Sequence, residues 1–346
     1  MKVCIIGTGW YGCHIASVLK DKFEITMIDK QSEIFDNSSY YNQNRLHLGF
    51  HYCRNYNTRN LCQTKYDMFF EKYSSIVEYI DNNFYLISND SLLDYQTFLS
   101  IYNYEKFCFE TIDNKIFNNI DGKIIKVNEC VINSDKAKEY FQKELENIKK
   151  IMNTNVHGYT KKSDIISVET NIGNIECDIL LDCTFNQLGL SKKTYIYENT
   201  ISLLFKKIND CKFDAITIMD GQFLSLYPRD INNNIYSLTD VENTPLIKST
   251  NYQDILNFQA TEEIIDNVKN KIIKKTEIYY PDFLKSFEYN GYFLSKKTKQ
   301  ISSSDSRDII IEEIEPNVIS VNCGKIYGIF DWEEYIVNKL TFNLIN

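Results

Sequence analysis

Long apolar runs and an excess of positive charge are both missing from this chain of 346 residues. No segment approaches the roughly 20 consecutive apolar residues of a membrane-spanning helix, so no membrane span is expected. Lysine and arginine number 38 against 47 acidic residues, and the net charge is −9. Because nucleic-acid phosphates repel an acidic protein, this balance disfavours nucleic acid as a partner. The expected ligand is a small-molecule substrate, and nothing in the sequence indicates an oligomeric state.

Closely spaced cysteine pairs are also absent. The 10 cysteines are dispersed and none forms a CxxC pair, so neither a zinc site nor a redox pair is indicated and no metal is expected. Several, including Cys4, Cys183 and Cys323, fall in expected core strands, which is typical of buried thiols in a reducing cytoplasm. The apolar N-terminal stretch contains glycines and lacks a small-residue cleavage site after it, which argues against a signal peptide. We expect a cytoplasmic protein.

The most informative feature that is present is a GxGxxG turn at residues 7–12. It directly follows the apolar run at residues 2–6 and precedes a stretch with helical spacing. In a dinucleotide-binding fold, the first glycine permits the tight turn and the second lets the backbone approach a pyrophosphate. The third lets the helix lie close to the strand. The helix N-terminus, with its unpaired N–H groups and positive dipole end, then holds the pyrophosphate.

Asp29 supplies the second part of this pattern. It closes the next expected strand, residues 24–28, about 20 residues beyond the glycines, where a carboxylate binds a ribose hydroxyl. The combination of strand, glycine turn, helix, strand and acid predicts a dinucleotide site. The alternative is a glycine turn that binds nothing.

The chain beyond Asp29 does not continue in the regular strand–helix alternation of a nicotinamide-type domain. Helical spacing of apolar residues predicts helices at about residues 61–80, 134–152 and 252–269. Apolar runs predict strands at residues 84–87, 165–170, 175–177, 179–184, 201–205, 222–227, 235–238, 291–294 and 318–321. The nucleotide-type elements lie at the two ends and in a middle block, without a low-complexity linker, so we predict a discontinuous domain.

Two further motifs accompany the glycine turn. Residues 44–52 read Asn-Arg-Leu-His-Leu-Gly-Phe-His-Tyr, and residues 322–326 read Asn-Cys-Gly-Lys-Ile after an expected strand. With the glycine turn, they resemble the FAD-dependent oxidoreductases of the D-amino-acid oxidase superfamily, and within it the glycerol-3-phosphate and L-2-hydroxyglutarate dehydrogenase branches. The middle block around residues 155–181 is similar to the adenine-side loop and a later flavin-domain strand of that family. The family normally has a glycine after that strand, where residues 184–187 read Thr-Phe-Asn-Gln.

The resemblance implies a fold class and a division into domains. The expected fold is α/β (α+β overall), with a discontinuous glutathione-reductase-like Rossmann domain for FAD and an antiparallel-sheet substrate domain. The FAD-binding domain is expected to comprise residues 1–85, 130–188 and 300–346. The substrate domain is expected to comprise residues 86–129 and 189–299.

The cofactor that the resemblance implies is FAD. In the family the first turn holds the pyrophosphate, the acid after the second strand binds the adenosine ribose, and the Asn-to-His segment lies along the flavin. The closing Gly-Lys segment approaches the pyrimidine end of the flavin ring. Carried over, the cofactor-binding residues are Gly7, Gly9, Trp10, Tyr11, Gly12, Asp29, Lys30, Asn44, Arg45, Leu46, Val156, Thr184, Gly324, Ile326 and Tyr327.

The resemblance also implies four catalytic residues, which are His47, His51, Tyr52 and Lys325. Lys325, or the helix that begins there, would stabilise negative charge on the reduced flavin. His51 and Tyr52 match positions that face the substrate, where the glycerol-3-phosphate branch has Arg-Tyr. Imidazole in place of a fixed guanidinium argues against a tightly held phosphate and supplies a group suited to general-base work near neutral pH.

Two alternatives concern the histidines. His47 stands between two leucines, which also fits a core histidine hydrogen-bonded to a backbone carbonyl. A covalent histidyl-flavin bond at His47 or His51 is an alternative to non-covalent binding.

The implied activity is that of an FAD-dependent oxidase or dehydrogenase. It would transfer a hydride to the flavin from a small amine, amino acid, hydroxy acid or sugar derivative. One alternative is a non-redox flavoenzyme such as a sugar-nucleotide mutase, and another is an NAD-dependent dehydrogenase. A third is a binding or scaffold protein that keeps FAD for stability alone.

Overall fold

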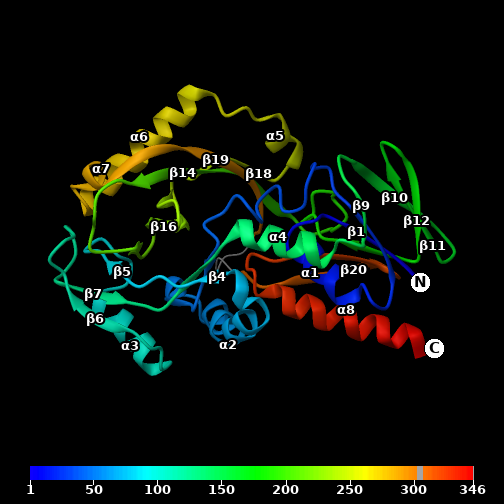
Figure 1. Cartoon of the computed structure of the whole chain (residues 1–346), viewed down its shortest axis with the longest axis horizontal. Helices are drawn as coiled ribbons and strands as arrows, with labels where there is room; N and C mark the ends of the chain where they lie inside the picture. Colours follow the sequence, from blue (N-terminus) through cyan, green and yellow to red (C-terminus); the bar gives the residue numbers. More distant parts are fainter. Residues whose placement is uncertain (302–306, 346) are drawn as a thin grey trace. The chain divides into compact units, whose positions relative to one another are not determined.

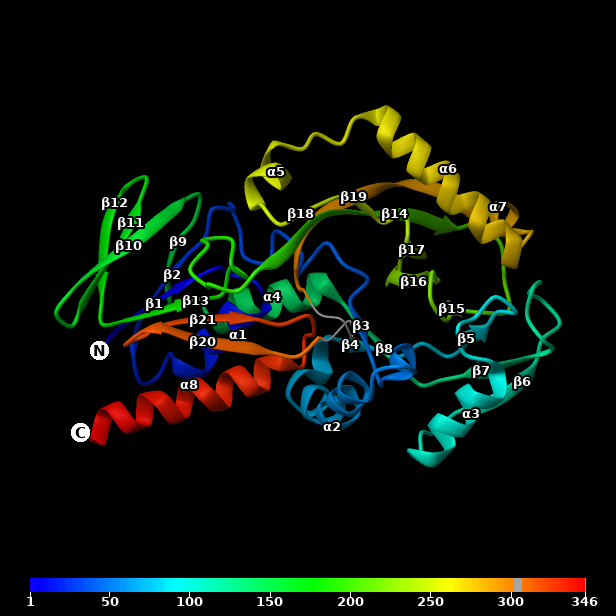
Figure 2. The ribbon, with the colours of Figure 1, turned by 180° about the vertical axis from the view of Figure 1, so that it is seen from behind.

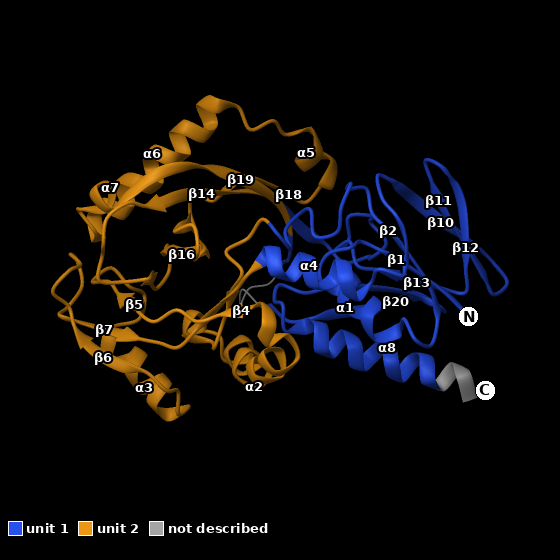
Figure 3. Cartoon of the chain, in the orientation of Figure 1, with its two compact units in different colours: residues 1–40, 134–197, 298–346 blue, residues 41–133, 198–297 orange. Residues whose placement is uncertain are grey.

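The structure, a computed structural model, describes residues 1–301 and 307–345 of the chain (Figures 1 and 2). The chain divides into two compact units (Figure 3). Unit 1 comprises Met1–Tyr40, Ser134–Tyr197 and Thr298–Asn346, and unit 2 comprises Tyr41–Asn133 and Glu198–Lys297. Among the helices within the described ranges, none is long and apolar enough to cross a membrane.

Unit 1 is built on a 6-stranded sheet in the order β20-β21-β13-β1-β2-β9. Its strands are β1 (Lys2–Ile6), β2 (Glu24–Ile28), β9 (Lys149–Ile151), β13 (Ile179–Asp182), β20 (Ile310–Glu315) and β21 (Val318–Asn322). Neighbouring strands pair in parallel from β21 to β9, and β20 is an antiparallel edge strand. Every residue of β13 is buried, as its continuous apolar run predicts for a strand covered on both faces.

Two layers cover this sheet. On one face lie α1 (Trp10–Leu19) and α8 (Gly328–Ile345), which contact each other, and Figure 2 shows α8 running along β20 and β21. The side chain of Ile5 in β1 lies beneath Gly12 on this face. Cys4 and Ile6 point the opposite way and pack against Ile166. That residue belongs to a 3-stranded antiparallel sheet of β10 (Val156–Lys162), β11 (Ile165–Thr170) and β12 (Gly173–Cys177). Unit 1 also contains α4 (Ser134–Glu144).

Unit 2 is built on a 9-stranded sheet in the order β18-β14-β17-β16-β15-β5-β7-β6, with β19 paired to β14. Its strands are β5 (Asn83–Ile87), β6 (Glu110–Asp113), β7 (Lys123–Lys126), β14 (Tyr195–Lys207), β15 (Ala215–Met219), β16 (Leu224–Asp230), β17 (Ile235–Asp240), β18 (Pro245–Ser249) and β19 (Phe287–Gln300). The pairing from β14 through β17 and β16 to β15 is antiparallel, whereas β15 and β5 pair in parallel.

A smaller sheet and several helices complete unit 2. The sheet has the order β3-β8-β4, with β3 (Arg45–Leu46), β4 (Val77–Glu78) and β8 (Cys130–Ile132). The helices are α2 (Tyr56–Tyr73), α3 (Tyr95–Tyr104), α5 (Tyr252–Asn257), α6 (Glu262–Tyr279) and α7 (Phe283–Ser286), with the 3-10 turns η1 (Phe50–Tyr52) and η2 (Ser74–Ile76).

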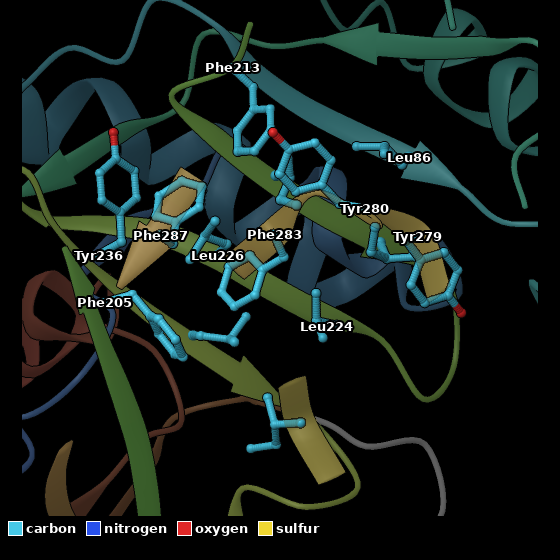
Figure 4. Packing of buried hydrophobic residues seen from close by; sticks show 14 of the residues in the cluster. Leu86, Phe205, Phe213, Leu224, Leu226, Tyr236, Tyr279, Tyr280, Phe283 and Phe287 are labelled. Carbon is cyan, nitrogen blue, oxygen red and sulfur yellow. The ribbon is translucent and has the colours of Figure 1, made fainter. Parts of the chain in front are cut away.

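The main core of unit 2 lies between the large sheet and the helices α6 and α7. Alternate residues of each strand face these helices, for example Leu224 and Leu226 of β16, which share one cluster with Ile272 of α6 and Phe283 of α7. Figure 4 shows the aromatic rings that gather there, and Figure 1 shows α6 lying over β14 and β19. Ser225 stands between these two leucines in β16 and faces the opposite side of the sheet. There its hydroxyl accepts a hydrogen bond from Arg45, which belongs to the motif at residues 44–52.

Three helices differ from the expected ranges. The helix expected at 61–80 is α2, which begins earlier because the Asn55 side chain caps it by accepting from the Thr58 N–H. It also ends earlier than expected, at Tyr73, and residues 77–78 form β4. The helix expected at 134–152 ends at Glu144, and residues 149–151 form β9, which pairs with β2. The helix expected at 252–269 is two helices, because Thr261 caps a new one by accepting from the Ile264 N–H.

The expected α/β fold class is confirmed, since a mainly parallel sheet and a mainly antiparallel sheet are both present. The compact units and the expected domains differ over residues 41–85 and 130–133, which group with unit 2, and over residues 189–197 and 298–299, which group with unit 1. The reason in unit 2 is strand pairing: β3 and β4 both pair with β8, and β5 lies inside the large sheet.

Candidate functional site

Four loops of unit 1 leave the same edge of its 6-stranded sheet. Gly7 follows β1, Asp29 follows β2, Thr184 comes shortly after β13, and Gly324 comes shortly after β21. Because these strands are parallel, their carboxyl ends meet at one edge. The crevice beyond that edge is where open α/β sheets bind ligands. The structure thus brings together expected cofactor-binding residues from four separate parts of the sequence.

In the glycine turn, the backbone at Gly7 and Gly12 packs closely against other backbone atoms. Gly7 has φ +96°, and a Cβ on it would lie 2.8 Å from the carbonyl oxygen of Cys183. A Cβ on Gly12 would lie 1.9 Å from the carbonyl oxygen of Gly7. A Cβ on Gly9 would meet only the Ser39 hydroxyl, at 2.5 Å. The first and third glycines are therefore required by the fold of the turn itself, as the motif predicts.

Side chains of unit 1 brace this turn from two directions. The Trp10 N–H at the start of α1 donates to the Ser39 hydroxyl over 3.0 Å, while the Trp10 ring is buried against Phe35 and Phe141. The Tyr11 hydroxyl donates to the carbonyl oxygen of Lys325 over 2.6 Å. The side chains of Trp10 and Tyr11 therefore serve packing and bracing, so any contact of these two residues with a cofactor would come from their backbone.

Asp29 ties the glycine turn to the end of β2. Its Oδ2 accepts from the Thr8 N–H at 2.7 Å and from the Thr8 hydroxyl at 2.8 Å. Its Oδ1 accepts from the Gln31 N–H at 3.0 Å. A carboxylate offers about four acceptor positions, so this arrangement leaves room for one ribose hydroxyl.

The loop after β13, where the resemblance leads us to expect a glycine, has instead two residues in left-handed backbone conformation. Phe185 and Asn186 both have φ 57°. Asn186 is held by Tyr197, whose hydroxyl accepts from Asn186 Nδ2 over 3.0 Å and donates to its carbonyl oxygen over 3.1 Å. Thr184 donates through its N–H and its hydroxyl to Asp182 Oδ1, at 2.9 and 2.6 Å. The turn is thus built without glycine, and the Thr184 hydroxyl is directed to its own strand.

The remaining expected cofactor residues of unit 1 lie around the same edge. Lys30 Nζ donates to Gln187 Oε1 over 2.8 Å, and Val156 is half-buried at the start of β10. Ile326 and Lys325 are half-buried, and Tyr327 is fully buried. Contacts of Tyr327 with a ligand would therefore come from its backbone.

The motif at residues 44–52 lies wholly in unit 2. The Asn44 carbonyl accepts from the Ile132 N–H over 2.8 Å, and β3 pairs with β8. Leu46 is fully buried. Gly49 has φ +119° and precedes η1, the turn that carries His51 and Tyr52. This segment is thus a fixed part of unit 2.

Arg45 points into the interior of unit 2. Its Nη1 donates to the Tyr85 hydroxyl over 2.7 Å, and its Nη2 donates to the Ser225 hydroxyl over 2.5 Å. Its guanidinium carbon lies 3.9 Å from the centroid of the Tyr227 ring. The side chain is 2% exposed. A cofactor contact of Arg45 would therefore come from its backbone.

His47, His51 and Tyr52 come together within unit 2, as the motif implies. The ring centroids are 5.2 Å apart for His47 and His51, 5.5 Å for His47 and Tyr52, and 5.2 Å for His51 and Tyr52. The His51 ring also lies 4.2 Å from Phe223 in an edge-to-face arrangement. Lys325, the fourth expected catalytic residue, belongs to unit 1.

Glu129 is a buried acid beside this cluster that the sequence did not indicate. Its Oε1 lies 3.8 Å from His47 Nδ1, and the carboxylate is 0% exposed. The only signal in the sequence is an acid directly before the apolar strand β8, and such a residue ordinarily lies on the surface. His47 itself is partly exposed, at 15% for the side chain.

Arg59 of α2 supports the turn that carries His51 and Tyr52. Its Nη1 donates to the carbonyl oxygens of Tyr52 and Cys53, both at 2.8 Å. Its Nε donates to Glu105 Oε2 over 2.8 Å, and its Nη2 also pairs with that carboxylate. Both side chains are largely buried, so the pair links α2, η1 and the end of α3.

Replacing Arg59 with methionine is expected to lower the free energy of unfolding by about 3 kcal/mol, because it leaves a buried carboxylate and two carbonyls without their donor. Urea unfolding followed by circular dichroism measures this. The matched control is Lys285→Met, which removes an exposed pair with Asp282 and should change the free energy by less than about 0.5 kcal/mol. Equal stability of the two variants would show that the Arg59 pair does not hold η1.

No family model matches the chain. It is 29% identical over 345 residues to the FAD-dependent monooxygenase FPY4 of Fusarium mangiferae, covering 97% of this chain and 90% of that protein.

Solved structures share the fold. Glycine oxidase from Geobacillus kaustophilus matches with a TM-score of 0.73 at 9% identity, over 96% of this chain and 91% of that one. Dithionite-reduced L-α-glycerophosphate oxidase from Mycoplasma pneumoniae, with FAD bound, matches with a TM-score of 0.74 at 12% identity, over 98% and 94%. The chain is thus similar in sequence to a protein named as an FAD-dependent monooxygenase and in fold to two oxidases.

Proposed function

We propose that this chain is an FAD-dependent oxidoreductase that acts on a small molecule. The observation that carries the proposal is the meeting of the glycine turn, Asp29 and the Gly324 loop at one edge of the sheet in unit 1. The name of the fungal relative and the FAD in the Mycoplasma structure favour FAD over NAD. The same comparisons favour a redox enzyme over a scaffold.

The residues of unit 1 fit an FAD molecule. The glycine turn, which the close backbone contacts of Gly7 and Gly12 fix in place, leads directly into the N-terminus of α1, where a pyrophosphate would be held. Asp29 keeps one acceptor position for the adenosine ribose. Lys325, or the N-terminus of α8, would stabilise negative charge on the reduced flavin. When bound, the flavin supplies the acceptor for a hydride from the substrate.

The residues of unit 2 supply acid–base chemistry. Oxidation of a hydroxyl also requires a base for its proton, and an imidazole serves this role near neutral pH. His51 and His47 are the candidate bases, and Tyr52 would hydrogen-bond the substrate. An amine, amino acid, hydroxy acid or sugar derivative fits this set better than a phosphorylated substrate, because no guanidinium stands at the His51 position.

A monooxygenase is the second candidate, favoured by the name of the fungal relative. In that reaction a reduced nicotinamide reduces the flavin, one atom of dioxygen enters the product, and the other leaves as water. The two candidates therefore differ in the source of electrons. Substrate reduces the flavin in the first, and a nicotinamide does so in the second.

The purified protein is expected to be yellow and to release a compound with the mass of FAD. Mixing it anaerobically with amines, amino acids, hydroxy acids and sugars should identify a substrate that bleaches the flavin without added reductant. Bleaching by a reduced nicotinamide alone, with ¹⁸O from labelled dioxygen in the product, would select the monooxygenase. A colourless protein would contradict FAD, and a yellow protein that no donor reduces would favour the scaffold or mutase alternatives.

A further inference from the structure

Glu129 lies at the centre of a buried polar network in unit 2. The Leu48 N–H donates to its Oε1 over 2.8 Å, and the Tyr85 hydroxyl donates to its Oε2 over 2.6 Å. Arg45 Nη1 lies 3.9 Å from Oε2, and His47 Nδ1 lies 3.8 Å from Oε1. The carboxylate thus lies close to three residues of the motif at 44–52, which are Arg45, His47 and Leu48.

These neighbours favour the ionised form of Glu129. Burial has the largest effect and leaves the pKa of this carboxyl above its usual value, while Arg45, the Tyr85 hydroxyl and backbone N–H groups act in the opposite direction. Tyr85 accepts a hydrogen bond from Arg45 Nη1, so its own proton is directed to Glu129. The groups that hydrogen-bond this carboxyl, the Leu48 N–H and the Tyr85 hydroxyl, are thus both donors. If the carboxyl were neutral, its own proton would need an acceptor that these groups do not offer. The network therefore holds a carboxylate.

His47 is the imidazole beside Glu129, and imidazoles ordinarily titrate close to neutral pH. The titratable rings that face His47 itself are His51, at 5.2 Å between ring centroids, and Tyr52, at 5.5 Å. The other titratable groups that interact with Glu129 belong to β3, β5, β8, β16, α2 and α3. They are Arg45, Tyr85, Cys130, Tyr227, Tyr66 and Tyr102. Burial raises the pKa of the four tyrosines and of the thiol, so they stay protonated when an imidazole changes charge.

We propose that Glu129 is a positioning residue for His47. The carboxylate lies 3.8 Å from Nδ1, which is an ion-pair separation and not a hydrogen bond, so it acts on the imidazole through its charge. That charge favours the tautomer with the proton on Nδ1 and leaves Nε2 as the basic nitrogen. Arg45 and Tyr85 hold the carboxylate in place for this task. A carboxylate behind a histidine selects the tautomer and stabilises the imidazolium that forms when Nε2 takes a proton. The catalytic consequence rests on the proposed function, whereas the choice of tautomer does not.

The test is the ¹⁵N spectrum of histidine-labelled protein with its cofactor, in which the His47 ring is identified by its loss in His47→Gln. In the wild type we expect the proton on Nδ1, and in Glu129→Gln we expect a shift toward the Nε2–H tautomer. Glu198→Gln is the matched control, because Glu198 is equally buried in unit 2 at 2% exposure and pairs with Lys248. It should leave the His47 spectrum unchanged.

A second readout is the rate of flavin reduction against pH. If His47 is the base whose deprotonation gives the acidic limb, loss of the negative charge makes its imidazole harder to protonate, and the limb should move to lower pH in Glu129→Gln. If His51 is the base, the limb should stay where it is. The maximal rate should fall about 10-fold. Tyr85→Phe, which keeps the carboxylate, should retain the Nδ1–H tautomer.

The outcomes separate this inference from the proposed function. An Nε2–H tautomer in the wild type, or an unchanged tautomer in Glu129→Gln, overturns the positioning role whatever the kinetics. The wild-type spectrum alone decides the matter if Glu129→Gln does not fold. A changed tautomer with an unchanged rate and pH profile upholds the contact and removes His47 from the proposed reaction.

Discussion

Replacing Gly12 with alanine is expected to abolish FAD binding and to destabilise unit 1. The new Cβ would lie 1.9 Å from the Gly7 carbonyl oxygen, so α1 must move away from β1. The turn cannot yield easily, because the Gly7 N–H donates to the Ile28 carbonyl over 2.9 Å and Gly7 itself packs on Cys183. Such overpacking costs about 3 kcal/mol or more. Flavin absorbance per mole of protein and the thermal unfolding midpoint measure the two effects.

The control for this variant is Gly158→Ala. Gly158 lies in β10 of the same unit, and a Cβ there would meet no atom within 4 Å. We expect it to keep its flavin and its unfolding temperature. Wild-type flavin content in Gly12→Ala would contradict the assignment of this turn to the pyrophosphate.

Gly9→Ala separates binding from folding. A Cβ at Gly9 would meet only the Ser39 side chain, which can rotate away, so this variant should fold normally. It should nevertheless bind FAD more weakly, because the methyl group would stand where the backbone approaches the pyrophosphate. If Gly9→Ala folds and binds FAD like the wild type, the motif is structural in this chain.

The residues proposed to bind FAD at the edge of the 6-stranded sheet could be predicted from the sequence, because their positions depend mainly on local sequence spacing. The turn at residues 7–12 and Asp29 lie within one strand–helix–strand unit, whose geometry follows from spacing alone. Gly324 could be placed beside them because it follows an apolar strand, and parallel strands end at a common edge. The conformation of the loop at Phe185 and Asn186 could not be predicted, since Tyr197 holds Asn186 and the Phe185 ring lies against Tyr11.

The surroundings of His47 could not be predicted, because they depend on contacts between distant parts of the chain. Glu129 meets Leu48 across 81 positions, and Tyr85 meets Arg45 across 40. No periodicity in the sequence relates these residues. The same limit explains the grouping of residues 41–85 with unit 2, which follows from strand pairing over long separations.

The end of helix α4 was also set by a tertiary contact. Ile148 continues the helical spacing that begins at Ser134, yet α4 ends at Glu144. The following residues instead pair with β2, with Lys149 opposite Thr26. Apolar spacing is satisfied equally by a longer helix and by a short helix followed by a strand, so the choice depends on the neighbouring strand.

Replacing His51 with alanine is expected to slow substrate-dependent flavin reduction by about 10²–10⁴-fold, the usual loss when a general base is removed. FAD content should not change, because the residues proposed to bind its pyrophosphate and ribose lie in unit 1, whereas His51 lies in η1 of unit 2. Stopped-flow mixing with the substrate under anaerobic conditions measures the rate, and absorbance of the purified variant measures the flavin.

The matched control is His157→Ala, since His157 is exposed on β10 of unit 1 and should reduce its flavin at the wild-type rate. The pH profile gives an independent check. If His51 is the base, the acidic limb seen in the wild type should disappear in His51→Ala, because no imidazole remains to be deprotonated for the reaction. If instead the variant is slow but keeps that limb, His51 only packs beside the reacting groups and His47 is the base. Wild-type turnover in His51→Ala would remove this residue from the reaction and leave the chemistry to His47 and Tyr52, the two rings that lie beside it.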